Sequence, residues 1–282
     1  MTQSNAPTPT GVASTNLIDQ QLTDLVDRHL EGDFKNLVDF GHSGELLKDL
    51  RWKLGSEHCT VIHGNENALD QLRSADVSGP VDQWKVVDFY DLPSSDLDPD
   101  ALIMANVLHE VYSLEGRAGN DTCFPINHEL GMDCVRRVLG DAASILKSGG
   151  ALLIATEVLG FDGGDVEILL KTDEARQAAR SLDNIFMSRD LKIEWQGDDR
   201  VCLDADAASL FVSAFDVPDR VMVRPFFTIE DWRVALHDMG FDLRLMASAP
   251  EGADEHRQSG YEILSGAENI PATHMALVAL KR

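Results

Sequence analysis

The sequence predicts an α/β protein in which a mostly parallel β-sheet is covered by helices on both faces. Short apolar runs alternate with helical stretches as far as residue 156, which is the pattern of successive strand–helix units. The runs at 101–108 and 151–156 are apolar almost throughout, as is typical of parallel strands buried on both faces. A length of 282 residues suits one large domain, or one domain that carries an inserted segment.

Residues 1–34 are predicted to form a polar tail followed by an amphipathic helix at 16–30. Apolar residues recur there at helical spacing, so one side of this helix should pack against the elements that follow. The core then begins with strands and helices in alternation. The strands are expected at 36–40, 59–62, 85–87, 101–108 and 151–156, and the helices at 45–54, 67–73 and 130–146.

The alternation stops after residue 160, which predicts an inserted cap segment over 161–225. This segment contains predicted helices at 173–186 and 205–215 and a strand-like run at 191–195. Its aromatic residues either line a lid over a substrate or form the segment's own small core. The chain therefore divides into a tail and helix (1–34), a core (35–160), the cap (161–225) and a C-terminal part of the core (226–282).

The C-terminal part opens with a capping-box pattern, in which Thr228 and Asp231 flank the start of a helix. Gly240 is placed where a helix commonly ends. Two further strands are expected at 241–246 and 274–280, which brings the predicted sheet to seven strands.

The net charge of −24 disfavours binding to nucleic acid or to an anionic membrane, because both carry negative charge. No long apolar span and no signal-peptide pattern is present, so we expect a cytoplasmic protein. No C-x-x-C pair occurs, and the His109-Glu110 dipeptide lacks the second histidine of a zinc-protease helix. No metal site is therefore expected.

A possible ligand-binding turn follows the first core strand. In the sequence from Leu37 to Leu47, a strand is followed by a turn with two glycines, Gly41 and Gly44, and then by a helix. Glycines at such a turn let backbone amides approach a nucleotide closely. Many strand–helix turns contain glycines for structural reasons alone, so this segment by itself leaves both interpretations open.

The order of the downstream motifs gives the turn more weight. Val87-Asp88-Phe89-Tyr90-Asp91-Leu92-Pro93 comes next, then Ala105-Asn106-Val107-Leu108-His109-Glu110-Val111, then Ile145-Leu146-Lys147-Ser148-Gly149-Gly150. Together these segments resemble the successive motifs of class I S-adenosylmethionine-dependent methyltransferases, over roughly residues 36–157. The resemblance implies a Rossmann-like sheet of seven strands whose last strand is antiparallel.

The resemblance also implies a cofactor, S-adenosyl-L-methionine with S-adenosyl-L-homocysteine as its product, and a set of residues that hold it. Asp39, Gly41, Ser43 and Gly44 would line its methionine and ribose part. Asp88 would accept a hydrogen bond from the adenine amino group while Phe89 packs near the ring. Asn106 and Leu108 would lie beside the sulfonium.

Two positions depart from the family pattern. The turn after the first strand is one residue shorter or has lost a glycine, and His63 stands where the family has a carboxylate that holds both ribose hydroxyls. A neutral imidazole cannot offer two acceptor oxygens as a carboxylate does. Glu66 could substitute if the turn is reshaped.

The predicted function is methyl transfer to oxygen or nitrogen of a small-molecule acceptor. His109 and Glu110 are the candidate catalytic residues, and His109 could instead cap the strand or support a loop. The alternative is a methyltransferase-like protein that has lost donor binding and acts as a partner subunit or a non-methylating ligand-binding protein. A dehydrogenase is disfavoured because G-x-G-x-x-G is absent. A homodimer is compatible with either function.

Overall fold

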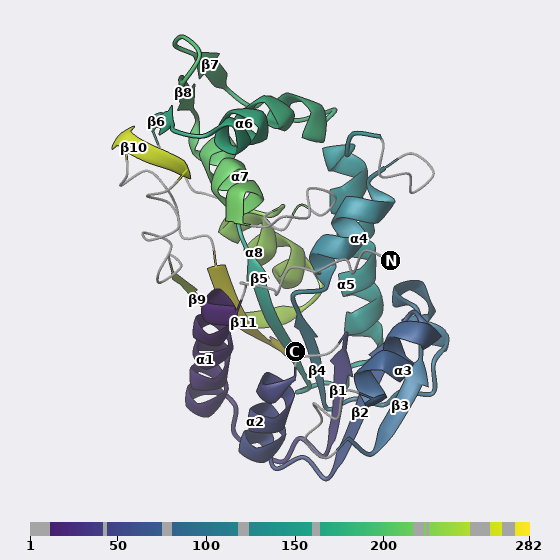
Figure 1. Ribbon diagram of the computed structural model, residues 1–282. Helices are drawn as coiled ribbons and strands as arrows, with labels where there is room; N and C mark the ends of the chain where they lie inside the picture. Colours follow the sequence, from purple (N-terminus) through teal and green to yellow (C-terminus); the bar gives the residue numbers. More distant parts are fainter. Residues whose placement is uncertain are drawn as a thin grey trace.

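The computed structural model describes residues 12–41, 44–74, 81–117, 124–159, 164–216, 223, 226–248, 260–266 and 274–282. Its centre is a seven-stranded sheet in the order β3-β2-β1-β4-β5-β11-β9 (Figure 1). The strands are β1 (Asn36–Phe40), β2 (His58–His63), β3 (Gln83–Val86), β4 (Ala101–Ala105), β5 (Ala151–Glu157), β9 (Phe241–Ser248) and β11 (His274–Lys281).

The pairing confirms the predicted sheet. β1 pairs in parallel with β2 on one side and with β4 on the other, and β4 pairs in parallel with β5. β11 runs antiparallel to both β5 and β9, so the last strand of the chain is the antiparallel one. The carboxyl ends of β1, β2, β3 and β4 therefore meet at one edge of the sheet, where open α/β proteins bind ligands.

Successive residues of the central strands face opposite layers, which explains why these strands are apolar throughout. In β4, Leu102 and Met104 belong to one hydrophobic cluster, whereas Ile103 belongs to the other. The first cluster also contains residues of α4 (Leu108–Glu115), α5 (His128–Ile145) and α8 (Ile229–Asp238). The second contains residues of α1 (Val12–His29), α2 (Glu45–Leu54) and α3 (Glu66–Ser74).

The predicted strand at 101–108 is too long, and this expectation is corrected. β4 ends at Ala105, Asn106 turns the chain with a positive φ of 53°, and α4 already begins at Leu108. Leu108 and Val111 are buried in the same cluster as the strand, so the apolar run continues from strand into helix with Asn106 as its one polar residue. His109 and Glu110 consequently lie in the first turn of a helix and not at the end of a strand.

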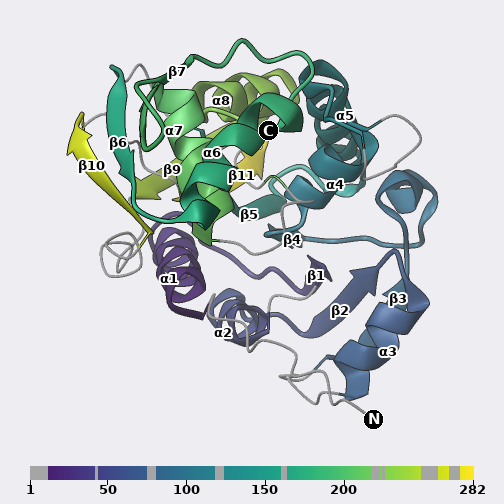
Figure 2. The ribbon, with the colours of Figure 1, turned by 45° about the horizontal axis from the view of Figure 1, so that its top comes forward.

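The cap contains more β-structure than the sequence pattern indicated. β6 (Val166–Leu170), β7 (Ile193–Trp195) and β8 (Arg200–Leu203) form an antiparallel sheet in the order β10-β6-β8-β7. β10 (Tyr261–Ser265) comes from the C-terminal part of the chain, so this sheet joins two of the predicted segments. Figures 1 and 2 show these strands with α6 (Asp173–Ile185) and α7 (Ala205–Asp216) at the end of the molecule opposite α2 and α3.

Aromatic side chains attach the cap to the core. Phe211, Phe226 and Phe227 are fully buried, which favours the interpretation that they form a core and do not line a lid. The ring of Phe186, which follows α6 in the cap, packs against that of Tyr112 in α4, with their centroids 6.4 Å apart. Tyr112 Oη lies 2.8 Å from Nδ1 of His128, at the start of α5.

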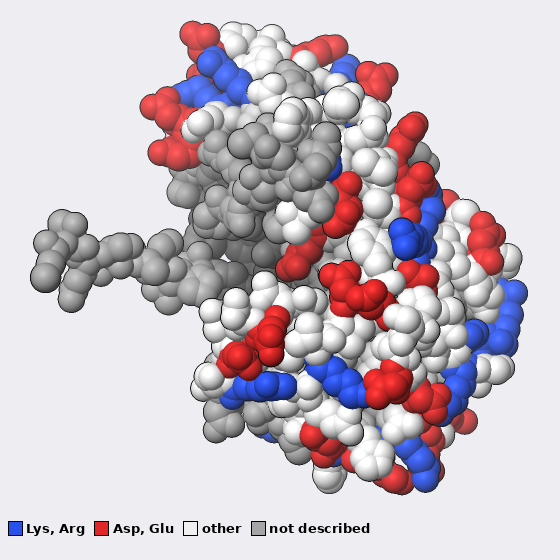
Figure 3. Space-filling model, turned by 90° about the vertical axis from the view of Figure 1, so that its right-hand side faces the viewer, with Lys and Arg blue, Asp and Glu red and all other residues white. Residues whose placement is uncertain are grey.

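The C-terminal helix follows its predicted signals. Thr228 and Asp231 form a reciprocal capping box at the start of α8, and Gly240 follows the helix with a positive φ of 85°. Among the described residues, no helix is both long enough and apolar enough to span a membrane. On the face shown in Figure 3, the described basic side chains are interspersed with acidic ones and form no continuous patch.

Candidate functional site

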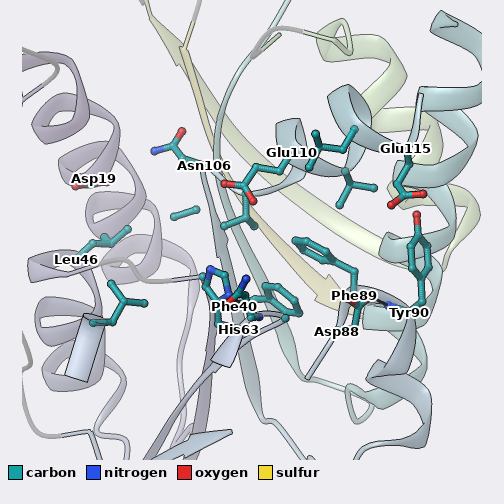
Figure 4. A pocket seen from close by; sticks show the side chains of 18 residues that line it. Asp19, Phe40, Leu46, His63, Asp88, Phe89, Tyr90, Asn106, Glu110 and Glu115 are labelled. Carbon is teal, nitrogen blue, oxygen red and sulfur yellow. Dashed lines mark hydrogen bonds between the residues drawn. The ribbon is translucent and has the colours of Figure 1, made fainter. Parts of the chain in front are cut away.

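A cavity of about 690 Å³ opens at the carboxyl edge of the sheet. Its wall contains residues that follow β1, β2, β3 and β4, together with residues of α1, α2 and α4 (Figure 4). The cavity is lined by Asp19, Phe40, Gly41, Leu46, His63, Gly64, Asn65, Leu72, Asp88, Phe89, Tyr90, Ala105, Asn106, Val107, Glu110, Val111, Leu114 and Glu115.

The turn after β1 approaches the turn after β4 closely. Gly41 has a positive φ of 102°, and its amide donates a hydrogen bond to the carbonyl oxygen of Ile62 (3.0 Å). A Cβ atom at Gly41 would overlap the side chain of Val107, so only glycine fits both the backbone and the space. Gly44 precedes α2 with a φ of 55° and does not line the cavity. Ser43 lies outside the described residues.

The end of β2 places an imidazole in the cavity wall. His63 Nδ1 accepts a hydrogen bond from the backbone amide of Asn65 (3.0 Å), so a neutral ring carries its proton on Nε2. The Asn65 side chain caps α3 by accepting from the amide of Asn67 (2.8 Å). Glu66 is exposed and does not line the cavity, which gives no support to the idea that it replaces the missing carboxylate.

The segment after β3 supplies a carboxylate and an aromatic ring. Asp88 caps the 3₁₀ helix η1 (Phe89–Ser94) by accepting from the amide of Tyr90 through Oδ1 (3.2 Å). Its other oxygen, Oδ2, lies beside Gly64, where an added Cβ atom would be 3.3 Å away. The Phe89 ring stacks on the Phe40 ring with centroids 4.1 Å apart and planes inclined by 13°. These two rings form an apolar wall next to the carboxylate.

The segment after β4 contributes polar groups from the opposite side. Asn106, with its positive φ, donates its backbone N–H to the carbonyl oxygen of Ala155 (2.8 Å) and lines the cavity with its side chain. Glu110 projects from the first turn of α4 toward the same space (Figure 4). Burial raises the pKa of Glu110, and the nearby His63 partly opposes this shift.

Six of the predicted site residues thus meet at one cavity: Gly41, His63, Asp88, Phe89, Asn106 and Glu110. Four others, including Gly44, do not line it. Asp39 is fully buried within β1, Leu108 is buried in the core, and His109 is buried in α4. The arrangement places Glu110, and not His109, at the cavity wall. The roles assigned to all these residues remain predictions.

The structure adds acidic and aromatic residues that the motifs did not reveal. Asp19 reaches the cavity from α1, and Tyr90 and Glu115 lie close together at its other end (Figure 4). Burial, followed by the charge of Asp49, raises the pKa of Asp19 from 3.8 to about 6. Asp19 follows the buried Ile18 on an otherwise ordinary amphipathic helix, so no sequence signal distinguishes it from a solvent-facing acid.

No protein-family model and no curated protein matches the sequence. Many solved structures are similar in fold. The N-methyltransferase NodS from Bradyrhizobium japonicum WM9, solved with S-adenosyl-L-homocysteine, has a TM-score of 0.50 and 11% identity, over 99% of this chain and 93% of that one. An S-adenosylmethionine-dependent methyltransferase from Mesorhizobium loti has a TM-score of 0.47 and 16% identity, over 94% of this chain and 100% of that one.

An O-methyltransferase family protein from Burkholderia thailandensis has a TM-score of 0.48 and 14% identity. The match covers 95% of this chain but 56% of that protein, so the chain spans little more than half its length. The likeness to NodS agrees with the strand order and the antiparallel last strand. The chain therefore has the Rossmann-like fold of class I methyltransferases, as the order of its motifs predicted.

Proposed function

We propose that this protein transfers a methyl group from S-adenosyl-L-methionine to oxygen or nitrogen of a small molecule. One observation carries the proposal: the Gly41 turn, Asp88 and Asn106, which follow three different strands, line a single cavity at the carboxyl edge of the sheet. The volume of about 690 Å³ is in the range of small-molecule sites. NodS, which shares the fold, was solved with the product of the same donor.

The residues present fit an adenosyl group. Phe40 and Phe89 offer an apolar wall for a flat ring, and the adjacent Asp88 carboxylate can accept from an exocyclic amino group. The Nε2–H of His63 can donate to one ribose hydroxyl. The donor would supply a methyl group on a positively charged sulfur, which is transferred in a single displacement.

The protein's contribution to such a displacement is alignment and proton removal. Val107, which packs tightly against Gly41, and the adjacent Asn106 define the wall next to which the acceptor must enter. Val111 and Leu114 of α4, the helix that follows, exclude water from that side of the cavity. Glu110 is the carboxylate placed to take the proton when the nucleophile carries one.

Calorimetric titration with S-adenosyl-L-homocysteine tests this function directly. We expect saturable binding at one site per chain, and weaker binding by Asp88→Asn. The asparagine can still accept from the amide of Tyr90, so this variant keeps the cap and loses the charge and the second acceptor oxygen. Asp91→Asn, on the same 3₁₀ helix but outside the cavity lining, is the matched control. Absence of saturable binding by the natural protein would instead support a fold that has lost its donor.

A further inference from the structure

The charged groups of the cavity wall are almost all negative. Four carboxylates line it, and they come from separate places: Asp19 from α1, Asp88 from the segment after β3, and Glu110 and Glu115 from α4. Among the described lining residues, the His63 ring is the only basic side chain, and neither lysine nor arginine occurs. The cavity is therefore an acidic, partly dehydrated site, and the described part of its wall offers no lysine or arginine to a negatively charged acceptor.

Glu110 occupies the central position among these carboxylates. It projects into the cavity near Asn106, with His63 on the opposite wall (Figure 4). The other charged groups around it are Asp19 of α1, Asp88 after β3 and Glu115 of its own helix. Beside it, Val107, Val111 and Leu114 form an apolar stripe along α4. A ligand that fits this wall combines an apolar body with a positively charged end.

Carboxylic acids and phosphates would enter this site against the charge of several carboxylates, with no lysine or arginine among the described lining residues to offset it. A neutral alcohol or phenol carries no charge and would gain no electrostatic attraction from the acidic wall. An amine that is protonated in solution gains attraction on entry and then needs to lose a proton before it can react. Glu110 meets both needs because it is a half-buried carboxyl group that lines the cavity next to the turn after β4.

We propose, on the basis of the methyltransferase function above, that the acceptor is a small primary or secondary amine and that Glu110 removes its proton. The ammonium form of the acceptor binds against the carboxylates and transfers one proton to Glu110. The nitrogen lone pair then forms the N–CH₃ bond while the C–S bond breaks, and its electron pair remains on sulfur. The products are a methylated ammonium ion, a neutral thioether and one proton, which Glu110 releases to solvent.

The first experiment identifies the acceptor class without knowledge of the natural substrate. The full chain is incubated with methyl-labelled S-adenosyl-L-methionine and, separately, with pools of small amines, phenols and carboxylic acids. We expect labelled product in the amine pool only, retained on a cation exchanger. Labelled product only in another pool would overturn the amine assignment, and so would no amine product from a protein that binds S-adenosyl-L-homocysteine. Failure to bind that product would overturn the methyltransferase function instead.

The second experiment tests Glu110 with the amine found. Glu110→Gln should bind S-adenosyl-L-homocysteine as well as the natural protein, which shows that the cavity is intact, and should lower kcat/KM by about 100-fold. Glu129→Gln is the matched control. Glu129 lies in the first turn of α5, as Glu110 lies in the first turn of α4, but Glu129 is exposed and outside the cavity lining. This control should keep full activity.

The dependence on pH distinguishes a proton acceptor from a merely structural carboxylate. In the natural protein, kcat/KM should fall as pH drops through the pKa of Glu110, because the protonated carboxyl neither attracts an ammonium group nor accepts its proton. This acidic limb should disappear in Glu110→Gln. An unchanged pH profile, or a variant as active as the control, would contradict the role of Glu110.

Discussion

Gly41 lies directly against the side chain of Val107, so that a Cβ atom added to Gly41 would overlap Cγ1 of Val107. This contact joins the turn after β1 to the turn after β4, and both residues line the same cavity. The relative position of the two turns therefore depends on the absence of one side chain. This dependence can be tested by adding a methyl side chain at Gly41.

Gly41→Ala should destabilise the fold by roughly 3 kcal/mol, because the added methyl group meets both a positive φ and the Val107 side chain. Gly32→Ala is the matched control: Gly32 has a φ of 121° but no atom within 4 Å of an added Cβ. This control should lose only the backbone contribution, about 1–2 kcal/mol. Urea unfolding of both variants measures the difference, and equal losses would contradict the importance of the contact.

Asn106 adopts a positive φ, which glycine tolerates and alanine does not. Asn106→Ala should therefore destabilise the protein by about 1 kcal/mol, whereas Asn106→Gly should stay within about 0.5 kcal/mol of the natural chain. Both variants remove the same side chain from the cavity, so both should weaken S-adenosyl-L-homocysteine binding to the same degree. If the glycine variant proved the less stable of the two, backbone strain at this position would not be the governing effect.

His63→Asp should increase the affinity for S-adenosyl-L-homocysteine about tenfold, because a carboxylate can accept from both ribose hydroxyls and the imidazole makes one hydrogen bond. The new charge also faces Asp88 and Glu110, which limits the gain. His58→Asp, at the exposed start of the same strand, should leave the affinity unchanged. Calorimetry on the two variants measures the effect. A loss of affinity in His63→Asp would show that the imidazole does not hold the ribose more weakly than a carboxylate at this position.

Asp19 should make stability depend on pH between about 4 and 6. Its pKa is raised to about 6 in the folded protein, so the folded state holds a proton that the unfolded state has released in this range. Its contribution to the free energy of unfolding is therefore complete below pH 4 and is lost as pH rises toward 6. Because this carboxyl is only partly buried, solvent screening reduces the effect to about 1 kcal/mol.

Asp19→Asn should accordingly stabilise the protein at pH 7 and have little effect at pH 4. Urea unfolding at the two pH values measures this, with Asp24→Asn on the same helix, outside the cavity lining, as the control. A gain of equal size at both pH values would point to packing and not to charge.

The sequence by itself determined the seven strands of the main sheet, apart from the end of β4, most helices and the edge of the sheet that carries the site. Alternating apolar runs and glycine turns are local signals, and parallel strands bring their carboxyl ends together wherever the intervening chain runs. For this reason Gly41, Asp88 and Asn106, which are far apart in sequence, could be assigned to one crevice before the fold was known. The capping box of Thr228 and Asp231 was equally local and equally reliable.

The tertiary structure decided which side chains reach the cavity. The apolar run through Ala105 and Leu108 concealed a change from strand to helix, because both elements are buried against the same core. That change turns Glu110 toward the cavity and leaves His109 buried, although the two residues are adjacent in sequence. Asp19 and the pairing of β10 with β6 depend on contacts between distant segments, for which the sequence carries no local pattern.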